Sequence, residues 1–125
     1  MQQNEKILIV EDDPIFQDIS AAVFSSYQLE IVSSGEEGVE IAQTFLPDLI
    51  VLDINLPEID GYETCQQLRE NSSTEQTPII FISEYKGLED RLKAYGVGGD
   101  DYFTKPFIPE EVVEILSRWL RKTAD

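Results

Sequence analysis

The sequence predicts an α/β fold in which five strands form one parallel sheet with helices on both faces. Short apolar runs rich in Ile and Val have strand length and lack polar alternation, as strands buried on both faces do. Stretches with apolar residues every three to four positions separate these runs and indicate helices. The two kinds of segment alternate along 125 residues, a length that fits a single domain with a core of its own.

The strands are expected at five places along the chain. The strongest apolar runs cover residues 7–10, 49–52 and 79–82, a weaker run covers 29–32, and a short fifth run covers 102–104. Strict alternation with helices and short loops favours right-handed crossover connections between these strands.

The first and last helices have recognisable entry residues. Asp13 stands at an N-cap position with Pro14 in the first turn, and Pro109 precedes the last apolar stripe. The three helices between them are expected over residues 34–45, 61–70 and 89–97. Residues 71–77 lack periodicity and are expected to form a longer loop.

The charge balance excludes several classes of function. The chain has 25 Asp and Glu against 9 Lys and Arg, with no His, for a net charge of -16. Such a surface repels nucleic acid and anionic membranes, so neither is expected as a direct partner. Cys65 is the only cysteine, which makes a zinc site improbable and favours a reducing compartment. Residues 1–5 are polar and no apolar run reaches roughly 18 residues, so a cytoplasmic location is expected.

Polar side chains follow four of the expected strands. In open parallel α/β sheets, ligands bind outside the carboxyl ends of the strands, so these side chains are expected to converge. They are Glu11, Asp12 and Asp13 after the first strand, Asp53 after the third, Ser83 after the fourth and Lys105 after the fifth.

This set of side chains suits phosphoryl chemistry with a divalent cation. Crowded carboxylates repel one another, and oxygen ligands select a hard ion such as Mg²⁺. A carboxylate such as Asp53 is a nucleophile towards phosphorus and forms an acyl phosphate. Mg²⁺ and Lys105 would offset charge on the phosphoryl oxygens, and Ser83 would donate a hydrogen bond to one of them.

Four segments together resemble the response-regulator receiver family. They are residues 7–14 (ILIVEDDP), 51–61 (VLDINLPEIDG), 80–83 (IFIS) and 100–107 (DDYFTKPF). No single segment is decisive, but four in the right order and spacing are highly specific. The resemblance implies a flavodoxin-like (βα)5 sandwich of strand order 2-1-3-4-5, with residues 1–125 as one receiver domain.

The resemblance also implies a role for each matching residue. Asp53 would accept a phosphoryl group from a histidine kinase or a phosphotransfer protein. Asp13 would bind Mg²⁺ directly, together with Asp53 and the backbone carbonyl of Asn55, and Asp12 would act largely through water. Lys105 would pair with the phosphoryl oxygens.

A conformational switch is implied as well. Ser83 would move towards the phosphoryl group while the ring of Tyr102 turns inward, which would alter the surface made by the fourth helix, the fifth strand and the fifth helix. That surface would serve an unknown downstream protein, a missing effector domain or a phosphorylation-dependent dimer. Only residues 122–125 follow the last helix, so no effector domain is expected here, and a stand-alone regulator and a piece of a larger protein both remain open.

The sequence departs from the family pattern near the expected switch. Glu84 stands where the family commonly has a small residue, and it is expected to slow phosphoryl transfer or weaken the active state. Tyr85 and Asn55 occupy positions with which the family tunes hydrolysis, and a bulky Tyr85 is expected to slow dephosphorylation. The three glycines at the end of the fourth helix, Gly96, Gly98 and Gly99, are expected to weaken that helix.

Two other functions compete with a signalling phosphoacceptor. A small aspartate-nucleophile phosphatase resembling the haloacid dehalogenases would need an acid two residues after Asp53, where Asn55 stands and cannot shuttle a proton. A receiver-like interaction module that takes no phosphate would be expected to have lost Asp53, Lys105 or the acidic pair, and all of them are present.

Overall fold

The structure is a computed structural model that describes residues 4–85, 87–105 and 108–124. Within these ranges five strands alternate with five helices. The strands are β1 (Lys6–Val10), β2 (Gln28–Val32), β3 (Leu49–Asp53), β4 (Ile79–Ser83) and β5 (Asp101–Thr104). The helices are α1 (Pro14–Val23), α2 (Gly35–Phe45), α3 (Gly61–Glu70), α4 (Leu88–Gly96) and α5 (Pro109–Ala124).

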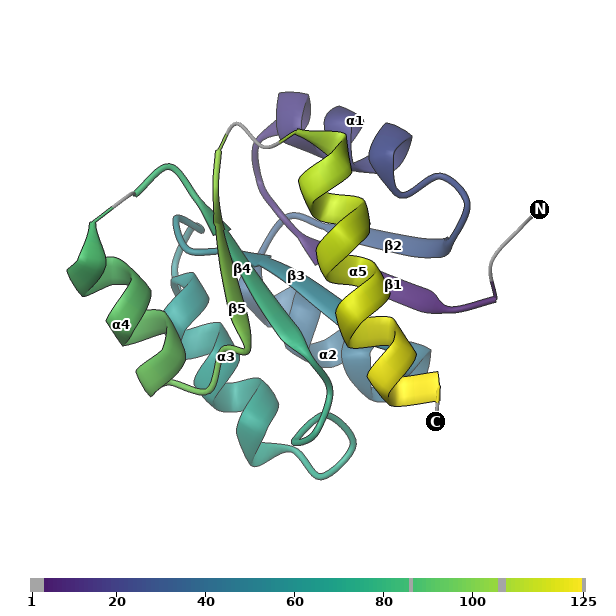
Figure 1. Cartoon of the computed structure of the whole chain (residues 1–125). Helices are drawn as coiled ribbons and strands as arrows, with labels where there is room; N and C mark the ends of the chain where they lie inside the picture. The colour runs from purple at the N-terminus through teal and green to yellow at the C-terminus, as the bar shows by residue number, and fades with distance from the viewer. Residues whose placement is uncertain (1–3, 86, 106–107, 125) are drawn as a thin grey trace.

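All strand pairs are parallel and the order in the sheet is β2-β1-β3-β4-β5 (Figure 1). This confirms the predicted fold class and strand order. From β1 the chain first adds β2 on one side and then β3 on the other, so the topological switch point lies between β1 and β3. Ligands of such sheets bind at the carboxyl ends of the two strands at this point. In the described part of the chain, no helix is both long and apolar enough to cross a membrane.

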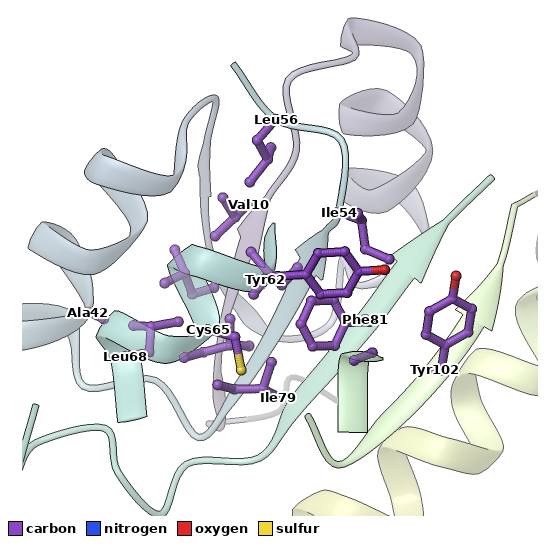
Figure 2. Close-up of a cluster of buried hydrophobic side chains, with 14 residues drawn as sticks. Val10, Ala42, Ile54, Leu56, Tyr62, Cys65, Leu68, Ile79, Phe81 and Tyr102 are labelled. Atoms are coloured by element: carbon purple, nitrogen blue, oxygen red, sulfur yellow. The ribbon is translucent and has the colours of Figure 1, made fainter. Parts of the chain in front are cut away.

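Each face of the sheet carries its own apolar core. One core contains side chains from α2, α3 and α4, and the rings of Tyr62 and Phe81 lie in it with centroids 5.8 Å apart (Figure 2). The other contains side chains from α1 and α5. All five residues of β3 and all five of β4 are buried, as the strongest apolar runs predicted. None of the five residues of β2 is buried, because β2 is the edge strand, which explains its weaker pattern.

Side-chain caps set the starts of the helices. The Asp13 carboxylate accepts a hydrogen bond from the Ile15 amide at the start of α1, as the sequence predicted. Ser34 caps α2 by accepting from the Glu37 amide. Asp60 caps α3, which the sequence pattern did not single out. These caps place the first turns of three helices at the carboxyl ends of the strands they follow.

The loop between α3 and β4 is organised by one side chain. The Arg69 guanidinium donates hydrogen bonds to the backbone carbonyls of Thr74 and Thr77, across residues 71–77. It also donates to the Gly98 carbonyl and forms an ion pair of 2.9 Å with Asp100. The predicted loop is therefore fastened to the start of β5, at the end of the sheet opposite the carboxyl ends.

The glycines near α4 fall at and beyond its end. Gly96 is the last helical residue, and Gly98 follows with a φ of 110°, a conformation that favours glycine at a helix terminus. Gly99 approaches the Phe81 ring so closely that a side chain would not fit. These glycines terminate α4 and pack the turn into β5 instead of interrupting the helix interior.

Candidate active site at the carboxyl ends of the strands

The carboxyl ends of β1, β3, β4 and β5 surround a small cavity of about 90 Å³. That volume is several times the roughly 10–15 Å³ that one water needs. The residues that line it are the last residues of these strands or lie just after them, and are Asp12, Asp13, Asp53, Asn55, Ser83, Glu84, Tyr85 and Lys105. The structure thus brings together the polar side chains that the sequence predicted would converge.

Lys105 is the cation at the centre of the site. Its ammonium nitrogen lies 2.6 Å from Glu11 Oε1 and 3.4 Å from Asp53 Oδ2, and all three side chains are buried. The same nitrogen lies 4.1 Å from the centroid of the Phe16 ring on α1. A buried charge is tolerated only when it is paired, so these contacts place the ammonium beside Asp53 and keep it there.

The protonation of Asp53 is set by its surroundings. Burial, and then the neighbouring Glu11 carboxylate, raise the pKa of Asp53 to about 7, although Lys105 acts in the opposite direction. Burial alone would lower the pKa of Lys105, but its hydrogen bond to Glu11 and the charge of Asp53 outweigh burial and raise it. The site therefore has a charged lysine and more carboxylate charge than one lysine neutralises.

The cost of burying a charged Asp53 beside Glu11 predicts that the difference in stability between wild type and Asp53→Asn depends on pH in buffer without divalent cations. Because the folded-state pKa of Asp53 is raised, its favourable contribution is complete below the unfolded pKa and is lost as the pH rises towards 7. The amide side chain of the variant is uncharged at every pH, so this cost is absent from the variant. We expect the free energy of unfolding of the variant to gain on that of wild type between pH 5 and pH 8, by on the order of 2 kcal/mol. Urea unfolding at both pH values measures this, and the same difference between variant and wild type at both would contradict the electrostatic cost assigned to Asp53.

Three carboxylates of the site lie within reach of one ion. Oxygen atoms of Glu11, Asp12 and Asp53 all fall within 4.8 Å of one another, and no other such group occurs in the part of the chain that the structure describes. All available donors are oxygens, which suits Mg²⁺ and disfavours soft metals. The residues present therefore fit the cation that the sequence predicted.

The two carboxylates grouped with Asp53 are those of Glu11 and Asp12, whereas the sequence predicted Asp12 and Asp13. Asp13 lines the cavity, but its carboxylate caps α1 and does not join the three-carboxylate group. Glu11, to which the sequence analysis gave no metal role, is buried and contacts Lys105. The run Glu11, Asp12, Asp13 allows the pair Glu11 and Asp12 or the pair Asp12 and Asp13. The N-cap position of Asp13 before Pro14 was the signal in the sequence that favoured Glu11 and Asp12.

Ser83, which lines the cavity, and Tyr102 both contact the backbone of Tyr85. Ser83 is fully buried and its hydroxyl accepts a hydrogen bond from the Tyr85 amide at 3.0 Å. The Tyr102 ring is buried, and its hydroxyl donates to the Tyr85 carbonyl at 2.6 Å. The guanidinium of Arg91 on α4 lies 5.3 Å from the Tyr102 ring centroid. The Tyr85 backbone thus connects Ser83 with Tyr102, and the Tyr102 ring in turn contacts Arg91 of α4.

The backbone of Gly61 packs directly against the backbone of Asp53 and Ile54. A Cβ at this position would lie 2.2 Å from the Asp53 carbonyl oxygen and 2.7 Å from Ile54 Cα. The Gly61 amide donates to the Ile54 carbonyl at 2.8 Å, which closes the turn between β3 and α3. The sequence predicted Gly61 as the end of a motif and the start of a helix but not this contact, because close backbone approach has no pattern in a single sequence.

Comparisons with known proteins agree with this geometry. The chain is 34% identical over 120 residues to the DNA-binding transcriptional regulator RpaA of Synechocystis and 37% identical over 120 residues to the cell cycle response regulator CtrA of Brucella ovis. These matches cover 94% of this chain, and the chain spans about half the length of these relatives, 50% and 51%.

Solved structures extend the similarity to the fold. A response regulator from Chloroflexus aurantiacus superposes with a TM-score of 0.90 at 30% identity, covering 95% of this chain and 99% of the other. The receiver domain of the histidine kinase PA1611 from Pseudomonas aeruginosa, described with a magnesium ion coordinated in its active-site cleft, has a TM-score of 0.89 at 32% identity. It covers 95% of this chain and 99% of the other.

A family model covers almost the whole of the sheet and its helices. It matches residues 7–117 and describes the response regulator receiver domain. This confirms the resemblance drawn from the four sequence segments. The chain belongs to the response regulator receiver domain family.

Proposed function

We propose that this domain accepts a phosphoryl group on Asp53 from the phosphohistidine of a histidine kinase or phosphotransfer protein. The observation that carries the proposal is the contact between Asp53 and Lys105, a buried carboxylate and a buried ammonium 3.4 Å apart at the mouth of a cavity. A nucleophile and a fixed cation placed this way suit phosphoryl transfer, where positioning and charge stabilisation dominate.

In the proposed reaction the phosphoryl group moves from a histidine nitrogen of the donor to a carboxylate oxygen of Asp53. A carboxylate oxygen of Asp53 attacks phosphorus and the phosphorus–nitrogen bond of the phosphohistidine breaks. The donor ring, which carries a proton on its other nitrogen, takes the bonding electron pair and leaves as neutral imidazole. Lys105 faces the incoming phosphoryl oxygens, and Ser83 at the cavity wall donates a hydrogen bond to one of them. Asn55 has no acidic proton to catalyse turnover, so the acyl phosphate persists as a signal.

Asp12, Asp53 and the backbone carbonyl of Asn55 would hold Mg²⁺. Glu11 would act less directly, because its two carboxylate oxygens already accept from Lys105 and from the Asp13 amide. When bound, the ion offsets negative charge on the carboxylates and on the phosphoryl oxygens.

The proposed switch runs from Ser83 through Tyr85 to Tyr102. If Ser83 turns towards a phosphoryl group, its hydrogen bond with the Tyr85 amide changes, and the Tyr85 carbonyl is the acceptor that holds the buried Tyr102 hydroxyl. We propose that phosphorylation stabilises the inward ring and thereby the surface formed by α4, β5 and α5. The partner at that surface would be a downstream protein or a second copy of the chain.

Incubation with Mg²⁺ and acetyl phosphate, followed by intact mass spectrometry, tests the proposal. We expect a gain of one phosphoryl group in wild type and none in Asp53→Asn. A second chain carrying a phosphorylated histidine should transfer its label to wild type only. The absence of any gain from either donor would favour the interaction module, and continuous release of phosphate without a trapped intermediate would favour the phosphatase.

Glu84 lies on the cavity wall and adds negative charge where an anionic donor enters. We expect Glu84→Ala to speed phosphorylation by acetyl phosphate up to about fivefold, the range of one exposed charge interaction. Stopped-flow fluorescence of a tryptophan or labelled variant measures the rate. Glu89→Ala removes an exposed charge from the first turn of α4 outside the cavity lining and is the matched control. Equal rates in wild type and Glu84→Ala would remove this role.

Tyr85 lines the same cavity, and 45% of the residue is exposed. We propose that its ring obstructs the approach of water to the acyl phosphate, so we expect Tyr85→Ala to lose the phosphoryl group several-fold faster than wild type. Tyr85→Phe keeps the ring without its hydroxyl and should decay as wild type does. The mass of the phosphorylated protein followed over time gives both rates, and a variant with alanine that decays no faster would show that the ring does not obstruct water.

A further inference from the structure

The outer edge of the sheet has a groove that is separate from the cavity at Asp53. It lies between the edge strand β2 and the helix α2 and encloses about 410 Å³. Its lining combines the half-buried apolar side chains of Val32 and Ile41 with the exposed side chains of Glu37, Glu40 and Thr44. The four lining residues of α2 stand at positions i, i+3, i+4 and i+7, so they form one face of that helix.

The backbone of β2 is open along this edge. Within the described residues β2 pairs with β1 alone and ends the sheet (Figure 1). Gln28 donates its amide to the Glu5 carbonyl, and the Val32 carbonyl accepts from the Glu11 amide, so the even-numbered residues of β2 face β1. Because bonded groups alternate along a strand, the amides and carbonyls of Leu29 and Ile31 point outward. An exposed row of this kind is a template for another strand.

The segments that build the groove belong to a long stretch of sequence whose charged residues are all acidic, and Lys6, whose ammonium lies 5.8 Å from the centroid of the Phe45 ring at the end of α2, stands just before that stretch. Between Lys6 and Arg69 the sequence has 13 Asp and Glu and no Lys or Arg. This stretch contains β2, α2 and their neighbours α1, β3 and most of α3. Glu30, which is exposed, lies on the same face of β2 as Val32 because side chains two apart share a face.

These features together define one kind of occupant. We propose that the β2 edge and the adjacent groove bind an extended basic segment of a partner protein by strand addition. The partner's backbone would pair with Leu29 and Ile31, an apolar side chain would enter between Val32 and Ile41, and its Lys or Arg side chains would meet Glu37 and Glu40. A second copy of the chain fits poorly, because its own β2 edge has the same negative charge.

Binding of a fluorescein-labelled peptide of alternating lysine and valine to the full chain tests the proposal. Fluorescence anisotropy should show saturable binding to wild type. Glu40→Lys should weaken it about tenfold, because one attraction becomes a repulsion. Glu36→Lys makes the same charge change on the same helix outside the groove lining, and it should alter the dissociation constant less than about twofold.

Further probes separate strand addition from diffuse attraction. Peptide binding should slow hydrogen exchange at the amides of Leu29 and Ile31, and a peptide of alternating lysine and glycine should bind much more weakly. Asp53→Asn should bind as wild type does, so this result is independent of the phosphoryl chemistry. Equal weakening by Glu36→Lys and Glu40→Lys, or unchanged exchange at β2, would overturn the proposal. So would protection of the same amides in a dimer without peptide.

Discussion

Replacing Lys105 by methionine is expected to slow phosphorylation of Asp53 at least about a hundredfold, the typical cost of removing one fixed electrostatic stabiliser from an active site. The ammonium is the only cation that the structure places beside Asp53 among the described residues, and it is buried with it. Without it, the phosphoryl oxygens would meet Glu11 and Asp12 with no fixed positive charge opposite. The rate of mass gain with acetyl phosphate and saturating Mg²⁺ measures the effect.

Two controls separate this chemistry from damage to the fold. Lys93→Met removes an exposed lysine from α4 and should phosphorylate at the wild-type rate. Lys105→Arg keeps a charge but changes the donor geometry, so an intermediate rate is expected. Circular dichroism confirms whether each variant is folded. A folded Lys105→Met variant that phosphorylates normally would refute the role proposed for this side chain.

Gly61→Ala is expected to lower the free energy of unfolding by about 3 kcal/mol, at the upper end for an overpacked site. The added methyl group would meet backbone atoms of Asp53 and Ile54, and backbone cannot rotate away as a flexible side chain can. Relief would require β3 and α3 to separate, which would also displace Asp53. Chemical unfolding measures the stability, and acetyl phosphate labelling measures the displacement.

Gly87→Ala is the matched substitution. The nearest atom to a Cβ at Gly87 is the carboxylate end of Asp90 at 3.2 Å, which can move aside. That variant should remain within about 0.5 kcal/mol of wild type, as ordinary surface substitutions do. If Gly61→Ala were equally mild, the turn after β3 would be more compliant than its backbone contacts indicate.

The sequence allowed the architecture and most of the cavity lining to be predicted. Apolar runs identify β3 and β4 well because both strands are buried throughout, and β2 was weaker because an edge strand needs less apolar surface. Helix starts were readable wherever a proline or serine marked them. Five of the cavity residues, Asp12, Asp13, Asp53, Ser83 and Lys105, followed from one rule, that polar side chains at strand ends meet at one edge of a parallel sheet. Asn55, Glu84 and Tyr85 were named from the resemblance to the receiver family.

What the sequence did not reveal depends on contacts between distant residues. The pairing of Lys105 with Glu11 joins residues 94 positions apart, and the approach of Gly61 to Asp53 is a matter of backbone distance. The Arg69 contacts with Gly98 and Asp100 are of the same kind. Whether Glu11 or Asp13 joins Asp12 in the carboxylate group was a question of register, and only the direction of each side chain separates an N-cap from a member of that group.

The burial of Lys105 has a consequence far from the site. A cation enclosed by Glu11 and Asp53 contributes little to the electric field outside the protein, so the field that approaching molecules meet is dominated by the surface carboxylates of a chain with net charge -16. That field accelerates the approach of Mg²⁺ and of basic protein surfaces and slows small anionic phosphodonors. Ionic strength, which sets a screening length of about 8 Å in physiological salt, would therefore change which donors reach Asp53 first.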